Sequence, residues 1–173
     1  CPDCASERTK VISASQVTGP SLWEEAPLTT ILIGINVIAF IAQILTGYPL
    51  SPFPSNVEGW VTEHGVFFGP LIAHGEWWRL ITSGFLHFGI VHIAFNMYLL
   101  FILGRLLEPS IGTLRFVVLY FASLLAGSFL ALWFTPDSVS AGASGAIFGL
   151  IGAAFVIARG RKPDAIAGPI GIL

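Results

Sequence analysis

Three residues could do chemistry in parts of the chain that are otherwise apolar. The first is Ser144, in the tetrapeptide Gly142-Ala-Ser-Gly145. A serine hydroxyl can act as a nucleophile when a neighbouring group removes its proton. Gly, Ala and Ser also let helices pack closely in membranes, so packing is the better interpretation of this tetrapeptide taken alone. Catalysis is the alternative.

The other two residues are His92 and Asn96, which are separated by Ile-Ala-Phe. Residues four apart lie on one face of a helix, about one turn from each other. Polar side chains are costly in hydrocarbon, so both should face a protein interior or a water-filled cavity. Taken alone, the pair is compatible with a functional site and equally with structural hydrogen bonds that hold neighbouring helices together.

The composition predicts a membrane protein. The 173 residues are 54% hydrophobic and 10% charged, with a mean hydropathy of +0.81. A soluble domain has about 25% charged residues, so this chain lacks the polar surface that water requires. The net charge of −2 is too small to indicate a nucleic-acid partner.

The charged residues divide the chain into apolar stretches of about the 20 residues needed to cross a bilayer. Pro136 and Asp137 place a turn between the third stretch and the fourth. We therefore expect an all-α, polytopic transmembrane bundle with four complete spans and the start of a fifth. The stretches are Leu28 to Gly47, Phe88 to Leu103, Arg115 to Asp137, Asp137 to Arg159, and Ala165 onward.

The basic residues predict an orientation. With a cytoplasmic N-terminus, seven Lys and Arg side chains lie inside and only Arg79 lies outside. This asymmetry follows the positive-inside rule. The segment from Tyr48 to Gly84 then forms an outer hairpin, with its aromatic rings at headgroup level.

The alternating directions of the spans bring the three polar residues to one depth. His92 and Asn96 come early in the second span, and Ser144 begins the fourth, which runs the same way. The free N–H groups and positive dipole at a helix N-terminus favour a developing anion. A hydroxyl nucleophile beside convergent donors is the arrangement that acyl transfer requires.

At this point the chain resembles the rhomboid family of intramembrane serine proteases. The resemblance covers roughly residues 28 to 162 and rests on several motifs in the family's order and spacing. The motifs are Gly75-Glu-Trp-Trp-Arg79, Phe85-Leu-His-Phe-Gly89, His92-x-x-x-Asn96, Gly104-Arg-Leu-Leu-Glu108 and Gly142-Ala-Ser-Gly145.

The resemblance implies a six-helix core and a plasma-membrane enzyme, bacterial by our hypothesis, that cleaves transmembrane segments of other proteins near the outer face. It implies Ser144 as the nucleophile, with His92 and Asn96 supporting the oxyanion and Gly142 allowing close packing of the loop. No cofactor is implied.

The family's general base is a histidine in the sixth span, and no histidine of this chain matches that position. We expect that histidine to follow Leu173, and we interpret the chain as a fragment. Two alternatives remain: a rhomboid-like protein that binds membrane helices without cleaving them, and a channel or transporter whose path is lined by His92 and Asn96.

The N-terminal region is predicted to be a separate unit. Residues 1–25 form a cytoplasmic tail and residues 26–173 the membrane domain, incomplete at its C-terminus. Cys1 and Cys4 have the spacing of half a zinc site, which needs about four ligands. A plain cytosolic tail is the favoured alternative.

Overall fold

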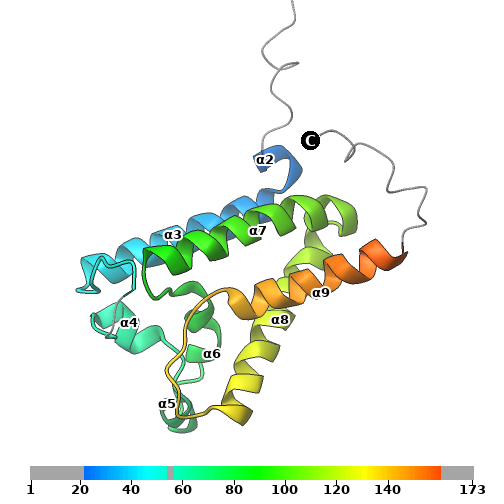
Figure 1. Ribbon diagram of the computed structural model, residues 1–173. Coiled ribbons are helices and arrows are strands. Elements are labelled where there is room, and N and C mark those ends of the chain that lie inside the picture. Colours follow the sequence, from blue (N-terminus) through cyan, green and yellow to red (C-terminus); the bar gives the residue numbers. More distant parts are fainter. Residues whose placement is uncertain (1–21, 54–56, 161–173) are drawn as a thin grey trace, which may run out of the picture.

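A computed structural model describes residues 22–53 and 57–160, and this part of the chain is mainly helical (Figure 1). Its one extended pairing is an antiparallel bridge between Phe67 and Ser140. The all-α prediction is therefore confirmed. The helices are α2 (Leu22–Glu25), α3 (Pro27–Leu45), α4 (Trp60–Gly65), α5 (Gly69–Ala73), α6 (Arg79–Thr82), the short 3₁₀ helix η2 (Ser83–Phe85), α7 (Ile90–Ile111), α8 (Thr113–Phe134) and α9 (Ser144–Gly160).

Three of the described helices, α3, α7 and α8, are long and apolar enough to cross a membrane. They coincide with the first three predicted spans. The fourth predicted span coincides with α9, which is apolar but has only 17 residues. The stretch from Ala165 onward lies outside the described residues, so the number of spans stays a prediction.

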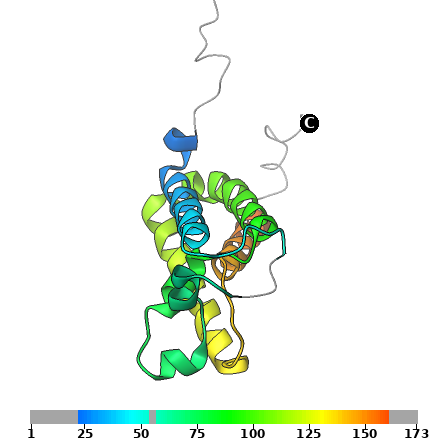
Figure 2. The same ribbon diagram turned by 90° about the vertical axis from the view of Figure 1, so that its left-hand side faces the viewer.

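The helices run in alternating directions. The start of α3 contacts the end of α7, because Leu28 N–H donates to the Glu108 carboxylate, so these two helices are antiparallel. Figure 1 shows α9 running the same way as α7, with α8 connecting them, and Figure 2 looks along α3, α7 and α9 while α8 runs toward the bottom of the view. Buried apolar side chains of α3, α7, α8 and α9 form one core between them.

Small residues let α8 and α9 approach closely, as the packing interpretation of the Gly142–Gly145 tetrapeptide predicted for Gly145. A Cβ on Gly145 would lie 3.6 Å from the Cα of Gly127, and one on Gly149 would overlap the side chain of Ser123. Gly152 does not belong to this contact, because no heavy atom lies within 4 Å of its Cβ position.

The helix α7 extends to Ile111, past Leu103, where the second predicted stretch ends, and past the charged residue Arg105. Both charges in its last turns have partners: Arg105 pairs with Glu25, and the buried Glu108 accepts bonds from Leu28 N–H (3.0 Å), Thr29 N–H (2.9 Å) and the Thr29 hydroxyl (2.8 Å). Because α3 has no side-chain cap of its own, Glu108 caps it from another helix.

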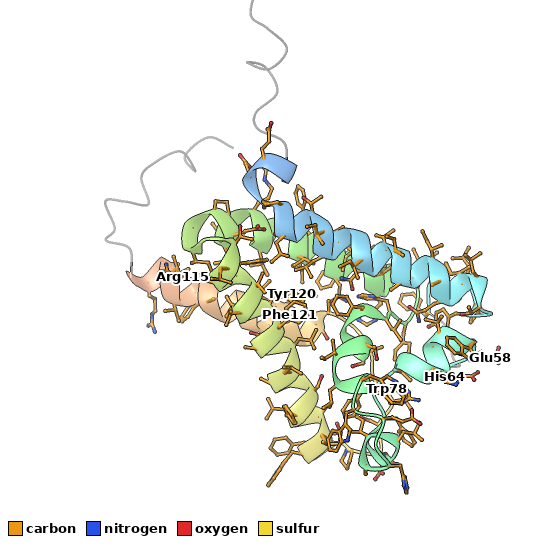
Figure 3. All side chains as sticks on the ribbon, turned by 180° about the vertical axis from the view of Figure 1, so that it is seen from behind. Glu58, His64, Trp78, Arg115, Tyr120 and Phe121 are labelled. Carbon is orange, nitrogen blue, oxygen red and sulfur yellow. The ribbon has the colours of Figure 1, made fainter. Side chains whose placement is uncertain are left out.

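The predicted outer hairpin consists of α4, α5, α6 and η2. The side chains of Trp60, Trp77 and Trp78 are exposed, as expected for aromatic rings at an interface. Figure 3 shows Trp78 beside His64, whose carbonyl accepts a bond from the Trp78 indole N–H (3.0 Å). Arg79 is buried and binds Glu76 and two hairpin carbonyls, so it holds the hairpin together.

Candidate active site

Ser144 is the first residue of α9, and its side chain is exposed. Its backbone N–H is one of the four at a helix start that have no partner within the helix. Within the described part of the chain, no group hydrogen-bonds to its hydroxyl. The serine is therefore accessible, beside a free N–H donor.

The loop that leads to Ser144 is fixed by backbone hydrogen bonds to the hairpin and to η2. Ser140 exchanges two bonds with Phe67, at 2.9 and 3.2 Å. Gly69 N–H donates to the Pro136 carbonyl (2.9 Å), and Gly142 N–H donates to the Ser83 carbonyl (2.8 Å). These contacts hold the loop at three points from Pro136 to Gly142, so they determine where α9 begins.

Gly142 lies between His92 and Ser144. Its φ of +132° is a conformation that residues with a side chain rarely adopt. A Cβ there would lie 2.8 Å from His92 Cε1, 2.9 Å from His92 Nε2 and 3.7 Å from Ser144 Oγ. The structure thus brings Gly142, His92 and Ser144 together, and only glycine fits between them.

The hydrogen bonds of His92 determine which ring nitrogen carries the proton. Phe88 N–H can only donate, and it points at His92 Nδ1 (3.2 Å). Nδ1 is therefore the acceptor, and in the neutral ring the proton is on Nε2. Nε2 is the nitrogen beside Gly142. His92 therefore presents an N–H donor toward the start of α9, as an oxyanion site requires and unlike a general base.

Asn96 lies one turn further along α7 and is buried. One N–H of its amide donates to the His92 carbonyl (2.9 Å). Among the described residues, its other amide N–H has no partner. Asn96 therefore shares the His92 face of α7, as expected from their spacing, and can supply a second side-chain donor.

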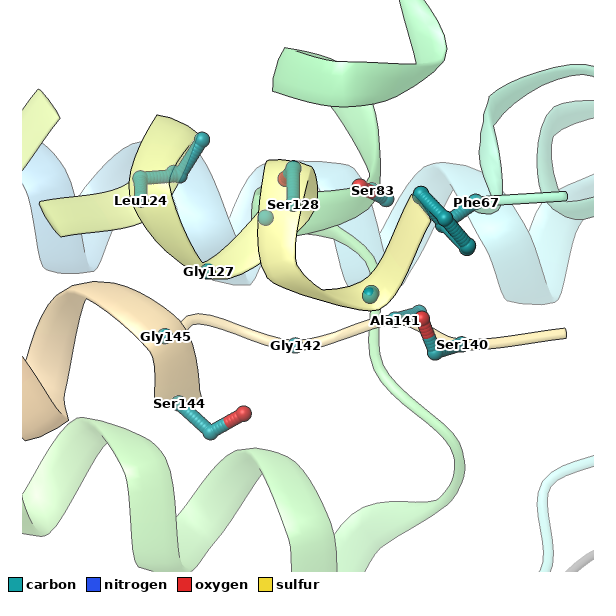
Figure 4. Close-up of a pocket in the computed structure, with 12 residues that line it drawn as sticks. Phe67, Ser83, Leu124, Gly127, Ser128, Ser140, Ala141, Gly142, Ser144 and Gly145 are labelled. Atoms are coloured by element: carbon teal, nitrogen blue, oxygen red, sulfur yellow. The ribbon is translucent and has the colours of Figure 1, made fainter. Parts of the chain in front are cut away.

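A cavity of about 200 Å³ adjoins Ser144. Figure 4 shows that its walls come from the hairpin, η2, α8 and the loop before α9. Hydroxyl groups are prominent in the lining, which offers polar partners to a bound peptide or to water. The serines that line it are Ser83, Ser128, Ser140 and Ser144.

Two buried polar residues near His92 were missed by the sequence analysis. His87 belongs to the Phe85–Gly89 motif but was given no role, and its ring is fully buried and lies against that of His92 (centroids 5.2 Å apart, at 67°). Gln43, in the last turn of α3, binds the backbone of His87. An amide side chain in a predicted span was a signal that could have identified Gln43, although Asn36 in the same span gives the same signal.

None of the histidines within the described ranges hydrogen-bonds to Ser144. His64 is stacked on Trp60 and His74 follows α5, both in the hairpin. The predicted general base beyond Leu173 therefore stays a prediction. Cys1 and Cys4 lie outside the described residues, and so does the prediction of a zinc site.

Comparison with known proteins gives matches over most of the membrane region. The sequence model of the Rhomboid domain matches residues 74–172. Rhomboid protease GluP of Bacillus subtilis is 48% identical over 105 residues, which are 58% of this chain and 20% of that protein. RHOMBOID-like protein 6, mitochondrial, of Arabidopsis thaliana is 35% identical over 132 residues (75% and 43%).

A third relative, Rhomboid-like protease 1 of Toxoplasma gondii, is 35% identical over 137 residues, which are 76% of this chain and 45% of that protein. The matched region thus spans less than half the length of each of these three relatives.

Proposed function

Because this chain belongs to the rhomboid family and is an integral, multi-pass membrane protein, we propose that it is a serine-type intramembrane endopeptidase with Ser144 as its nucleophile. The observation that carries the proposal is the position of the His92 Nε2–H donor. A Cβ built at Gly142 would lie 2.9 Å from this nitrogen and 3.7 Å from Ser144 Oγ, so the donor and the hydroxyl lie on either side of one small site.

The proposed reaction is acyl transfer from a peptide carbonyl to Ser144. Oγ attacks the carbonyl carbon as its proton passes to a general base, and the carbonyl oxygen becomes an oxyanion. The Ser144 N–H, His92 Nε2–H and the remaining Asn96 amide N–H are the donors that would stabilise this oxyanion. Collapse of this tetrahedral intermediate breaks the peptide C–N bond, and the amine leaves with the proton from the general base. Water entering through the neighbouring cavity would then attack the ester, releasing the carboxyl product and restoring the Ser144 hydroxyl.

The finer parts of the proposal concern the substrate and the location. We propose that the substrates are transmembrane segments of other proteins, cut near the outer face, where α7 and α9 begin. The identity with a Bacillus subtilis relative favours a bacterial plasma membrane. The distribution of Lys and Arg favours a cytoplasmic N-terminus.

The test is covalent labelling of the full-length protein in detergent with a fluorophosphonate probe, followed by identification of the labelled residue by mass spectrometry. We expect labelling at Ser144 and none in Ser144→Ala, with both proteins unfolding at similar temperatures. Labelling that persists in Ser144→Ala would refute the assignment of the nucleophile.

The alternative is a rhomboid-like protein that binds membrane helices without cutting them. The exposed Ser144 hydroxyl, to which no described residue hydrogen-bonds, is the observation that keeps this alternative open. Absence of labelling in a folded, full-length protein that still binds a transmembrane helix would favour it.

A further inference from the structure

Gln43 is fully buried in α3, and every polar atom of its side chain has a partner. Its Oε1 accepts from His87 N–H (3.0 Å). Its Nε2 donates to the Thr62 hydroxyl (3.1 Å) and to the His87 carbonyl (3.4 Å). The amide thus pairs with the backbone of His87 in both directions, across a sequence separation of 44 residues.

The His87 carbonyl belongs to the same peptide group as the Phe88 N–H. Because a peptide group is planar, the direction of its C=O determines the direction of its N–H. That N–H is the one that donates to His92 Nδ1 (3.2 Å). A continuous path therefore runs from Gln43 Nε2 through one peptide plane to the ring of His92.

The ring of His87 restrains His92 from a second direction. It is fully buried and contacts the His92 ring edge to face, and neither of its nitrogens has a partner among the described residues. The backbone of His87, and with it the position of this ring, is held by Gln43. Both restraints on His92 therefore depend on a single amide of α3.

We propose that Gln43 is a positioning residue for catalysis, which sets the tautomer and orientation of His92 through the peptide between His87 and Phe88. This inference rests on the proposed function. In the other neutral tautomer, Nδ1 carries the proton and Nε2 presents a lone pair toward the oxyanion, which it would repel. Aiming the Phe88 N–H at Nδ1 disfavours that tautomer.

The test substitutes Gln43→Met, which keeps a side chain of similar length and removes the amide. Asn36→Leu is the matched control: Asn36 is also a fully buried amide of α3, but its Nδ2 donates to the Leu32 carbonyl of its own helix and not to the segment before α7. Both substitutions alter the interior of one helix, but only one breaks the path to His92.

The effect of each substitution is measured in the full-length protein in two ways: by the tautomer of His92 and by the labelling rate of Ser144. ¹⁵N NMR of histidine-labelled protein, with His92 assigned from the spectrum of His92→Ala, should show the Nε2–H tautomer in the wild type and in Asn36→Leu. Gln43→Met should show a mixture of tautomers. The maximal rate of fluorophosphonate labelling at Ser144 should fall about tenfold in Gln43→Met, less than the hundredfold or more typical for a lost oxyanion donor.

The concentration of probe at half-maximal rate should stay unchanged in Gln43→Met, because Gln43 acts on the reacting geometry and not on probe binding. In a His92→Ala background, Gln43→Met should cause no further loss. An unchanged tautomer in Gln43→Met, or an equal loss of rate with and without His92, would overturn the inference. An unlabelled wild type would instead refute the proposed function, and the NMR comparison would still decide the effect of Gln43 on His92.

Discussion

Replacing Gly142 by alanine tests the geometry of the candidate site most directly. The new Cβ would be placed at a φ of +132°, a region occupied almost only by glycine, at a cost of about 1–3 kcal/mol. The same Cβ would lie 2.8 and 2.9 Å from two ring atoms of His92. The variant therefore carries a backbone penalty and a steric one.

The steric penalty falls on the group proposed to bind the oxyanion. Non-bonded heavy atoms of this kind pack at about 3.5–4.0 Å, so the ring and the new methyl group must separate by at least about 0.6 to 0.7 Å. An oxyanion donor works at about 2.7–3.1 Å, and a misplacement of about 1 Å can reduce the rate about a hundredfold. We therefore expect labelling of Ser144 to slow by about ten- to a hundredfold.

The assay is the rate of fluorophosphonate labelling of the full-length protein, together with its unfolding temperature in detergent. Gly152→Ala is the control, because Gly152 lies in α9, the helix that follows Gly142, and has no heavy atom within 4 Å of its Cβ position. That variant should label at the wild-type rate and gain up to about 1 kcal/mol from helix propensity.

Wild-type labelling of folded Gly142→Ala would refute the reasoning, because it would show that the His92 ring can move without affecting Ser144. Equal slowing in Gly142→Ala and Gly152→Ala would also refute it, since the effect would then belong to α9 as a whole.

Two further predictions concern stability. Glu108→Ala removes the acceptor of two backbone N–H groups at the start of α3 and should destabilise the protein by about 3 kcal/mol, while Glu25→Ala, at an exposed ion pair, should cost less than about 1 kcal/mol. Equal losses in thermal unfolding would contradict the capping role. Burial, and to a smaller extent the charge of His92, lowers the pKa of His87, which precedes α7, to about 3. An unfolded histidine titrates near 6.5. The contribution of neutral His87 to the free energy of unfolding is therefore fully present above pH 6.5, and it is lost as the pH falls toward 3, by about 1.4 kcal/mol per pH unit. The unfolding temperature of the wild type should be lower at pH 5 than at pH 7. The difference should be smaller in His87→Gln, which has no imidazole to protonate. An equal difference in the variant would refute the assignment of this pH dependence to His87.

The sequence predicted the helices well where composition alone determines them. Apolar stretches between charges become helices because no unpaired polar group survives in hydrocarbon. Thr135 and Pro136 end α8 as expected, since proline has no N–H to continue the helix. The extension of α7 to Ile111 was not predicted, because it depends on partners for Arg105 and Glu108 that lie about 80 residues away in the chain.

The sequence predicted those features of the candidate site that follow from helix periodicity and from the order of the spans. The spacing of His92 and Asn96 places both on one face of α7. The alternating directions of the spans bring Ser144 to the same end of the bundle as His92. The tautomer of His92 and the parts played by Gln43 and His87 could not be predicted, because they follow from contacts between α3 and the segment before α7. Such contacts leave only a weak trace in one sequence: a polar residue at an apolar position.

The capping of α3 by Glu108 has a consequence for biosynthesis. Thr29 is made 79 residues before the carboxylate that binds it. At about 5–20 residues per second, the ribosome needs about 4 to 16 s to reach Glu108. During that interval the first amides of α3 must be solvated by water or lipid headgroups. The N-terminal amides of α3 are therefore uncapped when this helix is made, and they gain their protein partner only after α7 has been made.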